Sequence, residues 1–152
     1  MFVAIDFDTD TLAAAMARSG FRTGARTFFV CEGVTHYLTP PAVDAMFRYV
    51  SGSAAPGSRM VFTYIHQSLL DGSAAFAGAE RTLAIVRQSG EPYTFGFDPA
   101  ELPRYLAARD LSLIEDVGAR EFRERYFVSR GRNHEPLSEF QRAALVEVSD
   151  RR

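Results

Sequence analysis

The stretch FFVCEGVTHYLTPPAVDAMF, residues 28–47, decides the fold. Its first residues form a continuous apolar run, which is typical of a strand that is buried on both faces. Thr39 can then cap a helix whose first position is Pro40, and both residue types are favoured at these positions. A buried strand joined to a helix by a short polar loop is the repeating unit of α/β proteins. The loop also holds four candidate site residues: Glu32, Gly33, His36 and Tyr37.

The alternation of strands and helices extends in both directions from this stretch. Helical spacing of apolar residues predicts helices between the first four strands, and a polar, arginine-rich stretch separates the last two. This order predicts a single α/β domain over residues 1–152, with a mainly parallel sheet and helices on both of its faces. The predicted strands are residues 2–7, 27–31, 60–65, 111–117 and 143–148.

Local signals predict where several helices begin. Asp8 or Asp10 is expected to cap the first helix. The stretch FDPAELPRYLAARD, residues 97–110, predicts a helix with Asp98 at its N-cap, although a second proline in it makes the first turn irregular. Residues 69–87 are mostly helical by pattern, but two glycines within them argue against one unbroken helix.

Composition excludes several classes of function. With 152 residues, of which 47% are hydrophobic and 24% charged, the chain can bury a core. A formal net charge of −2 offers no basic surface for nucleic acid or for an anionic membrane. No apolar run approaches the roughly 20 residues of a membrane span, and the first residues lack the features of a signal peptide. The sequence therefore predicts a cytoplasmic protein that acts on small, nearly neutral molecules.

The residue types that are missing exclude further chemistry. All 17 basic residues are arginine, so a Schiff-base lysine and a P-loop lysine are impossible. The single cysteine, Cys31, allows no internal disulfide, agrees with a reducing compartment and is interpreted as a small core residue. The three histidines, His36, His66 and His134, show no metal-ligand spacing, so no metal site is predicted.

Two of the predicted strands end in residues that suit a binding site. Ligands of α/β sheets gather at the carboxyl ends of the strands. Asp6 and Phe7 close the first strand, and Glu32 and Gly33 follow the second, so we expect these residues to share one pocket. An ionised carboxylate there can accept hydrogen bonds from an amine or from ribose hydroxyls. Glycine at the same point permits a positive φ or a close approach.

Each candidate also has a purely structural interpretation. Asp6 can cap the first helix instead of binding a ligand. Tyr37 can be a half-buried packing residue. His36 and His66 can be surface or hydrogen-bonded structural histidines, so the sequence leaves both interpretations open.

Three segments together resemble the leucine carboxyl methyltransferase family and its bacterial relatives among class I S-adenosylmethionine-dependent methyltransferases. They are CEGVTHYLTPPAVDAMFRYVSGSAAPGSRMVFTY, FGFDPAELPRYLAARDLSLIEDVG and SEFQRAALVEV. The first is the most specific, because family members carry an acidic residue and a tyrosine five apart, here Glu32 and Tyr37, before a proline-marked helix. The similarity extends over residues 2–148 but covers only the C-terminal portion of the family's domain.

The resemblance implies a partial Rossmann-like sheet that lacks its first two strands. Class I methyltransferases have the strand order 3, 2, 1, 4, 5, 7, 6, and this chain opens at what would be strand three. The glycine-rich loop and the acidic residue that hold the methyl donor in the family are missing with strands one and two. Either the enzyme is truncated or split, with a completing chain as a candidate partner, or it rearranges into a different sheet or a homo-oligomer. An exposed strand edge would favour pairing with another chain.

The resemblance also implies a cofactor and the role of each candidate. The cofactor is S-adenosyl-L-methionine, with Asp6 and Phe7 at its adenine and Glu32 and Gly33 at its amino-acid or sulfonium end. Tyr37 and its neighbour His36 are then the candidate catalytic residues, where the acceptor meets the methyl group. His36 departs from the family, which usually carries a bulkier apolar residue there.

The predicted function is O-methyl transfer to a carboxylate or hydroxyl of a small molecule or a peptide terminus. A carboxylate acceptor is already anionic and needs no base. A hydroxyl acceptor gains from one, and His36 or His66 is the candidate because imidazole titrates near neutral pH. The alternative is a catalytically inactive methyltransferase remnant that acts as an interaction module or subunit.

Overall fold

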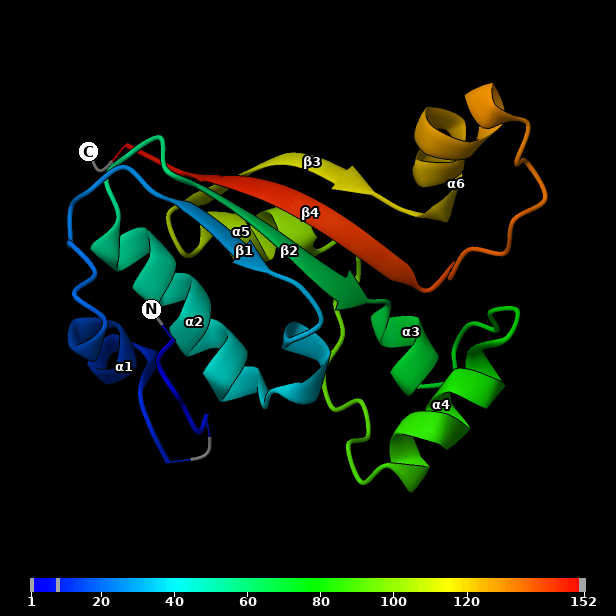
Figure 1. Cartoon of the computed structure of the whole chain (residues 1–152), viewed down its shortest axis with the longest axis horizontal. Helices are drawn as coiled ribbons and strands as arrows, with labels where there is room; N and C mark the ends of the chain where they lie inside the picture. The colour runs from blue at the N-terminus through cyan, green and yellow to red at the C-terminus, as the bar shows by residue number, and fades with distance from the viewer. Residues whose placement is uncertain (1, 8, 151–152) are drawn as a thin grey trace.

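The computed structural model describes residues 2–7 and 9–150, which form a four-stranded sheet with helices packed against it (Figure 1). The strands are β1 (Phe28–Cys31), β2 (Arg59–Ile65), β3 (Leu111–Val117) and β4 (Gln141–Val148). The α-helices are α1 (Leu12–Arg18), α2 (Pro40–Ser53), α3 (Gln67–Leu70), α4 (Ala79–Gln88), α5 (Leu102–Ala107) and α6 (Ala119–Phe122). Shorter helical turns are Thr35–Tyr37, Arg123–Phe127 and Val128–Arg130.

The sheet has the strand order β1-β2-β4-β3. β1 and β2 are parallel, and β4 is antiparallel to both of its neighbours, β2 and β3. Three of the four described strands therefore run in one direction, and β4 runs against them. This arrangement is the 4, 5, 7, 6 end of the class I order, so the predicted α/β fold with a partial Rossmann-like sheet is confirmed.

The core lies on one face of the sheet, between the strands and two helices. Met60, Phe62 and Tyr64 alternate along β2 and are buried toward α2 and α5. The ring of Phe47 from α2 packs edge-on against Phe62, with 4.9 Å between ring centroids. The whole apolar stripe of α2 is buried: Val43, Met46, Phe47 and Val50. Burial of this stripe explains why α2 holds its place along β1 and β2.

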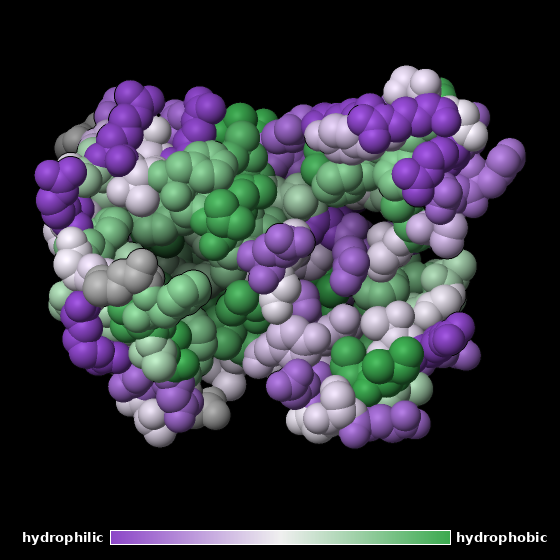
Figure 2. All heavy atoms as spheres, in the orientation of Figure 1, coloured by the Kyte–Doolittle hydropathy of each residue, from purple (hydrophilic) through white to green (hydrophobic). Residues whose placement is uncertain are grey.

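The opposite face is open over β1. α5 lies behind the strands in Figure 1, and Figure 2 shows hydrophobic side chains gathered over the strands on the front. Phe28 and Val30 point to this open side and are 59% and 68% exposed. The expectation that this strand is buried on both faces is therefore wrong, because within the described residues α2 and α5 both cover the other face.

Residues 2–7 do not form the predicted strand. A strand needs a neighbour for its backbone N–H and C=O groups, and the described part of the sheet offers none beside this segment. The segment instead turns into α1, and Phe7 packs against the edge of the core. The outer edge of β1 consequently has no partner strand among the described residues.

The helix starts follow the sequence in part. α2 begins as predicted, with the Thr39 hydroxyl accepting a hydrogen bond from a backbone N–H of the first turn. Thr11, and not Asp10, caps α1, while Asp8 lies outside the described residues. Asp98 closes a turn by accepting a backbone N–H at 2.9 Å, and α5 starts only at Leu102. Proline is tolerated in the first turn of a helix but not deeper, so α5 begins next to Pro103, the second proline of the predicted stretch.

Two further expectations concern the helices. α3 and α4 are separate helices, as the glycines between them indicated. Among the described residues, no helix combines the length and the apolar character that crossing a bilayer requires.

Candidate active site

The loop after β1 is fixed to β2 by side-chain and backbone hydrogen bonds. Gly33 has a φ of +71°, as its position predicted, and its N–H donates to the Thr63 hydroxyl at 2.8 Å. The Thr35 hydroxyl donates to the Thr63 carbonyl, also at 2.8 Å. Because a side chain at this φ is strained, glycine suits the turn that directs Thr35–Tyr37 over the end of the sheet.

A cavity of about 370 Å³ lies at the carboxyl ends of β1 and β2. We call it the aromatic cavity. The structure brings together around it the four candidates of the loop: Glu32, Gly33, His36 and Tyr37. Residues from distant parts of the sequence complete its wall, among them Tyr64, Tyr93, Phe122 and Arg142.

Three rings form one cluster in the wall of the aromatic cavity. The His36 ring lies 4.5 Å from the Tyr37 ring and 4.7 Å from the Tyr93 ring, and the two tyrosine rings are 5.4 Å apart. Tyr93 reaches this place because the N–H of Thr94 donates to the His36 carbonyl at 2.8 Å. The segment after α4 thus runs beside the loop after β1. Sequence reasoning missed Tyr93, because no motif surrounds it and only this long-range contact places it.

His36 is buried without a polar partner. His36 is only 5% exposed, and its Nδ1 has no hydrogen-bond partner among the described residues. Burial lowers the pKa of His36 below its ordinary value of 6.5, so the ring is neutral near pH 7. A neutral imidazole has one nitrogen that accepts and one that donates, and a buried polar atom without a partner costs about 1–3 kcal/mol.

A charged cluster of Tyr64, Asp116 and Arg142 lies beside the aromatic cavity, which Tyr64 and Arg142 line. The Tyr64 hydroxyl donates to the Asp116 carboxylate at 2.9 Å, and Arg142 Nε donates to both carboxylate oxygens at 3.1 and 3.0 Å. Burial, with the Asp116 charge beside it, raises the pKa of Tyr64 well above its usual range. The positive charge of Arg142 is therefore matched by Asp116. No local pattern in the sequence connects these three residues, which lie on three different strands.

A second cavity, of about 420 Å³, lies between β1, α1 and α2. We call it the apolar cavity, because most of its lining is apolar. Phe7 and Glu32 both line it, so the structure brings these two candidates together. Asp6 is exposed and lines neither cavity, and Gly33 lines only the aromatic one. Glu32 is thus the residue that the two cavities share.

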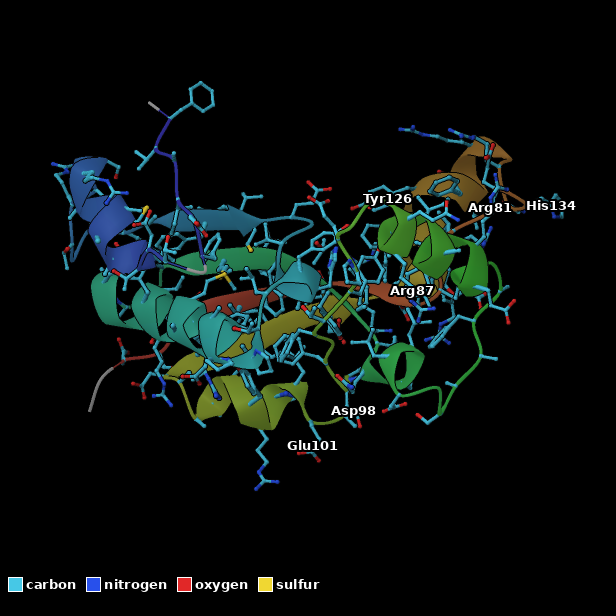
Figure 3. The ribbon with its side chains drawn as sticks, turned by 90° about the horizontal axis from the view of Figure 1, so that it is seen from below. Arg81, Arg87, Asp98, Glu101, Tyr126 and His134 are labelled. Atoms are coloured by element: carbon cyan, nitrogen blue, oxygen red, sulfur yellow. The ribbon has the colours of Figure 1, made fainter. Side chains whose placement is uncertain are left out.

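Cys31 and the other two histidines lie away from the aromatic cavity. Cys31 Sγ contacts Met46 Sδ at 3.6 Å, and burial raises the pKa of this thiol to about 11, as expected of a core residue. The His66 ring packs against Phe76, with 5.2 Å between ring centroids, and His66 lines neither cavity. His134 points away from the sheet in Figure 3. No cluster of three or more His, Cys, Asp or Glu side chains in the described chain is arranged to hold a metal ion.

Comparison with known proteins confirms the resemblance in the sequence. A model of the leucine carboxyl methyltransferase family matches residues 1–51. YktD of Bacillus subtilis, whose name assigns it provisionally to the S-adenosyl-L-methionine-dependent methyltransferases, is 26% identical over 140 residues, which cover 92% of this chain and 45% of that protein. A Mycobacterium avium protein with the same provisional assignment is 41% identical over 63 residues, which cover 41% of this chain and 21% of that protein. The chain spans less than half of the length of these relatives.

Solved structures show the same fold at low sequence identity. The structure of TnmH is similar over 98% of this chain and 35% of its own, with a TM-score of 0.55 and 13% identity. A Burkholderia thailandensis 1,6-didemethyltoxoflavin-N1-methyltransferase, solved with bound S-adenosylhomocysteine, covers 87% of this chain and 48% of its own, with a TM-score of 0.52 and 15% identity. These similarities establish a partial class I methyltransferase fold.

Proposed function

We propose that this chain forms part of an S-adenosylmethionine-dependent O-methyltransferase of the cytoplasm. The observation that carries the proposal is the position of Glu32, which lines both the apolar and the aromatic cavity. In methyl transfer, the donor and the acceptor lie on opposite sides of the methyl group. Glu32 lies where a donor in one cavity and an acceptor in the other could meet in this way. The provisional names of the relatives support methyl transfer, and they favour an enzyme over an inactive interaction module.

The apolar cavity suits the nucleoside part of the donor. Its volume of about 420 Å³ and its apolar lining, which includes Phe7 and Phe29, fit a flat base. At its end toward the aromatic cavity, the Glu32 carboxylate would accept hydrogen bonds from the donor's amine and favour its positive sulfonium. Gly33, which has a positive φ and no side chain, would let the donor approach the backbone closely at this end of the cavity. When bound, this cofactor supplies a methyl group that the sulfonium charge activates.

The sequence contains no glycine-rich fingerprint for the rest of the donor. We propose that further polypeptide completes this part of the site against the outer edge of β1. A further copy of this chain and a separate completing chain are both compatible with that edge. Asp6, which is exposed and lines neither cavity, would reach the adenine only after such completion.

The aromatic cavity would hold the acceptor. Tyr37 and His36 would orient it beside Glu32, and the surrounding rings would keep water out. Displacement at an activated methyl group requires mainly alignment of the reacting atoms, and well-oriented reactants can lower a barrier by several kcal/mol. The acceptors proposed for an enzyme of this kind are a carboxylate or a hydroxyl of a small molecule or of a peptide terminus.

Titration calorimetry with S-adenosylhomocysteine tests this function directly. We expect saturable binding to the purified chain, weakened about tenfold or more by Glu32→Gln, because a hydrogen bond to a charged group contributes about 1.5–3 kcal/mol. Glu91→Gln is the matched control, since Glu91 is exposed and lines neither cavity. Absence of binding at about 1 mM ligand, with and without a completing chain, would refute the proposal and favour the interaction module.

A further inference from the structure

We infer that the aromatic cavity selects a neutral aromatic hydroxyl compound, a phenol, as methyl acceptor, and that His36 receives its hydroxyl proton. The inference deepens the proposed function and rests on it. It excludes the carboxylate acceptors that the fold and the sequence leave open. Three features of the cavity carry it: its shape, its charge and the unpartnered nitrogen of His36.

The lining of the cavity suits a flat ring. The rings of His36, Tyr37 and Tyr93 lie within 4.5 to 5.4 Å of one another, and Phe122 of α6 lies on the wall of the same cavity. Aromatic pairs favour offset or edge-to-face contacts at such distances. A planar aromatic ligand would add a further member to this cluster, whereas a flexible aliphatic chain would lose rotational freedom with less contact.

The charge of the cavity disfavours an anion. Glu32 contributes a negative charge, and Arg142 is the only cation among the described residues of the lining. Arg142 is already committed to Asp116, with Nε at 3.0 and 3.1 Å from the two carboxylate oxygens. Its Nη1 lies next to Gly118: a Cβ added to Gly118 would be 2.6 Å from this nitrogen. A carboxylate ligand would therefore meet Glu32 without a free side-chain cation of the protein to balance it, while a neutral hydroxyl meets no such repulsion.

The unpartnered nitrogen of His36 supplies the acceptor for a hydroxyl proton. The ring touches Tyr37 and Tyr93, and the other charged or titratable groups around the cavity are Glu32, Tyr64 and Arg142. Nδ1 is buried and bonded to no described residue, and His36 lines the cavity, so a ligand O–H that packs against this ring and donates to it would satisfy the nitrogen. Burial also keeps this imidazole neutral, and only the neutral form can accept a proton.

The transfer step balances in atoms and charge. The phenol oxygen forms a bond to the methyl carbon while the carbon–sulfur bond breaks, and the bonding electron pair leaves with sulfur, which becomes a neutral thioether. The hydroxyl proton passes to the His36 ring, which becomes an imidazolium and later loses the proton to solvent. The positive charge of the sulfonium thus ends on the imidazolium, in a cavity that Glu32 also lines.

Binding of two matched probes tests the acceptor class without turnover. 2-Naphthol and 2-naphthoate share one ring system and differ in carrying a neutral hydroxyl or a carboxylate. We expect the wild-type chain, with S-adenosylhomocysteine present, to bind 2-naphthol at least tenfold more tightly at about pH 7, where the naphthol is neutral. Equal or tighter binding of 2-naphthoate would overturn the inference.

His36→Phe tests the role of the nitrogen, because it keeps an aromatic ring in the cluster and removes both ring nitrogens. The wild type should prefer 2-naphthol over 2-methoxynaphthalene, which has no hydroxyl proton, and the variant should lose this preference while still binding both. If the variant does not fold, the imidazole NMR signals of the wild type give the answer. 2-Naphthol should shift the His36 signal, assigned with the variants His66→Gln and His134→Gln, and 2-methoxynaphthalene should not. A preference that survives in His36→Phe, or an unmoved His36 signal, would refute the role.

Asp116→Asn tests the charge argument from the opposite direction. It keeps an oxygen that can accept from Tyr64 but removes the negative charge that balances Arg142. We expect the ratio of 2-naphthoate to 2-naphthol affinity to rise severalfold, and an unchanged ratio would contradict the argument. The two levels of inference fail separately. A chain that binds S-adenosylhomocysteine but prefers 2-naphthoate overturns the acceptor class alone, whereas a chain that never binds S-adenosylhomocysteine overturns the proposed function and the acceptor assignment with it.

Discussion

Replacing Asp116 by alanine should destabilise the protein more than replacing Glu115, the other carboxylate on β3. The change leaves the Arg142 guanidinium without its partner and the Tyr64 hydroxyl without its acceptor. Breaking a buried ion pair costs about 3–5 kcal/mol, and the side chains of Arg142 and Asp116 are only 21% and 13% exposed. Because some exposure remains, we expect about 3 kcal/mol, including the lost tyrosine hydrogen bond.

Urea unfolding measures this loss. For an unfolding slope of about 2 kcal/mol per molar urea, a loss of about 3 kcal/mol lowers the midpoint by about 1.5 M. Asp116→Asn should fall between the wild type and Asp116→Ala, since the amide oxygen can still accept from Tyr64. Circular dichroism and tyrosine fluorescence should report the same midpoint for each variant if unfolding is two-state.

The adjacent residue provides a matched control. Glu115 pairs with Arg125 on the surface, and their side chains are 46% and 43% exposed. Exposed pairs contribute little, because water screens them and ordering long side chains is unfavourable. Glu115→Ala should therefore leave the midpoint within error of the wild type. Equal shifts for Glu115→Ala and Asp116→Ala would refute the claim that burial makes the difference.

Three further outcomes are expected. Cys31, whose pKa burial raises to about 11, should react slowly with iodoacetamide at about pH 8 in the native chain and rapidly in urea, and fast native labelling would contradict its burial. Gly96→Ala should lower stability by about 1–3 kcal/mol in the urea assay, because a Cβ there would lie 2.9 Å from the Gln67 backbone, which cannot move aside as a side chain can. Backbone N–H groups of Gly118 and of Glu121 itself lower the pKa of Glu121 to about 2. Because this folded-state pKa lies below the ordinary 4.5, its stabilisation is present above pH 4.5 and is lost as the pH falls toward 2, so the thermal midpoint should fall over that range, and less so in Glu121→Gln.

The parts of the fold that depend on local sequence could be predicted. The pattern of β1, the cap at Thr39 and the buried stripe of α2 all reside within residues 28–53, and the structure has them where the sequence indicates. What failed depends on neighbours. Residues 2–7 have the composition of a strand but no partner to pair with, and β1 has an apolar outer face that nothing in the described chain covers.

The candidate site divides in the same way. The motif around Glu32 and Tyr37 identifies one wall of the aromatic cavity, because those residues follow one strand in sequence. The opposite wall comes from Tyr93 and Arg142, which long-range hydrogen bonds and strand pairing bring into place. Their residue types carry no local signal of a site, so only the three-dimensional arrangement reveals that the Arg142 charge is already neutralised.

The open edge of β1 has a consequence for how this protein behaves as its concentration changes. At this edge, the outward backbone N–H and C=O groups of β1 have no partner strand among the described residues, and the side chains of Phe28 and Val30 on the same strand are exposed. If another chain covers these groups, folding is coupled to association by mass action. The melting temperature should then rise as the protein concentration is raised. A melting temperature that is the same at micromolar and at near-millimolar protein would instead mean that this four-stranded sheet tolerates an uncovered edge by itself.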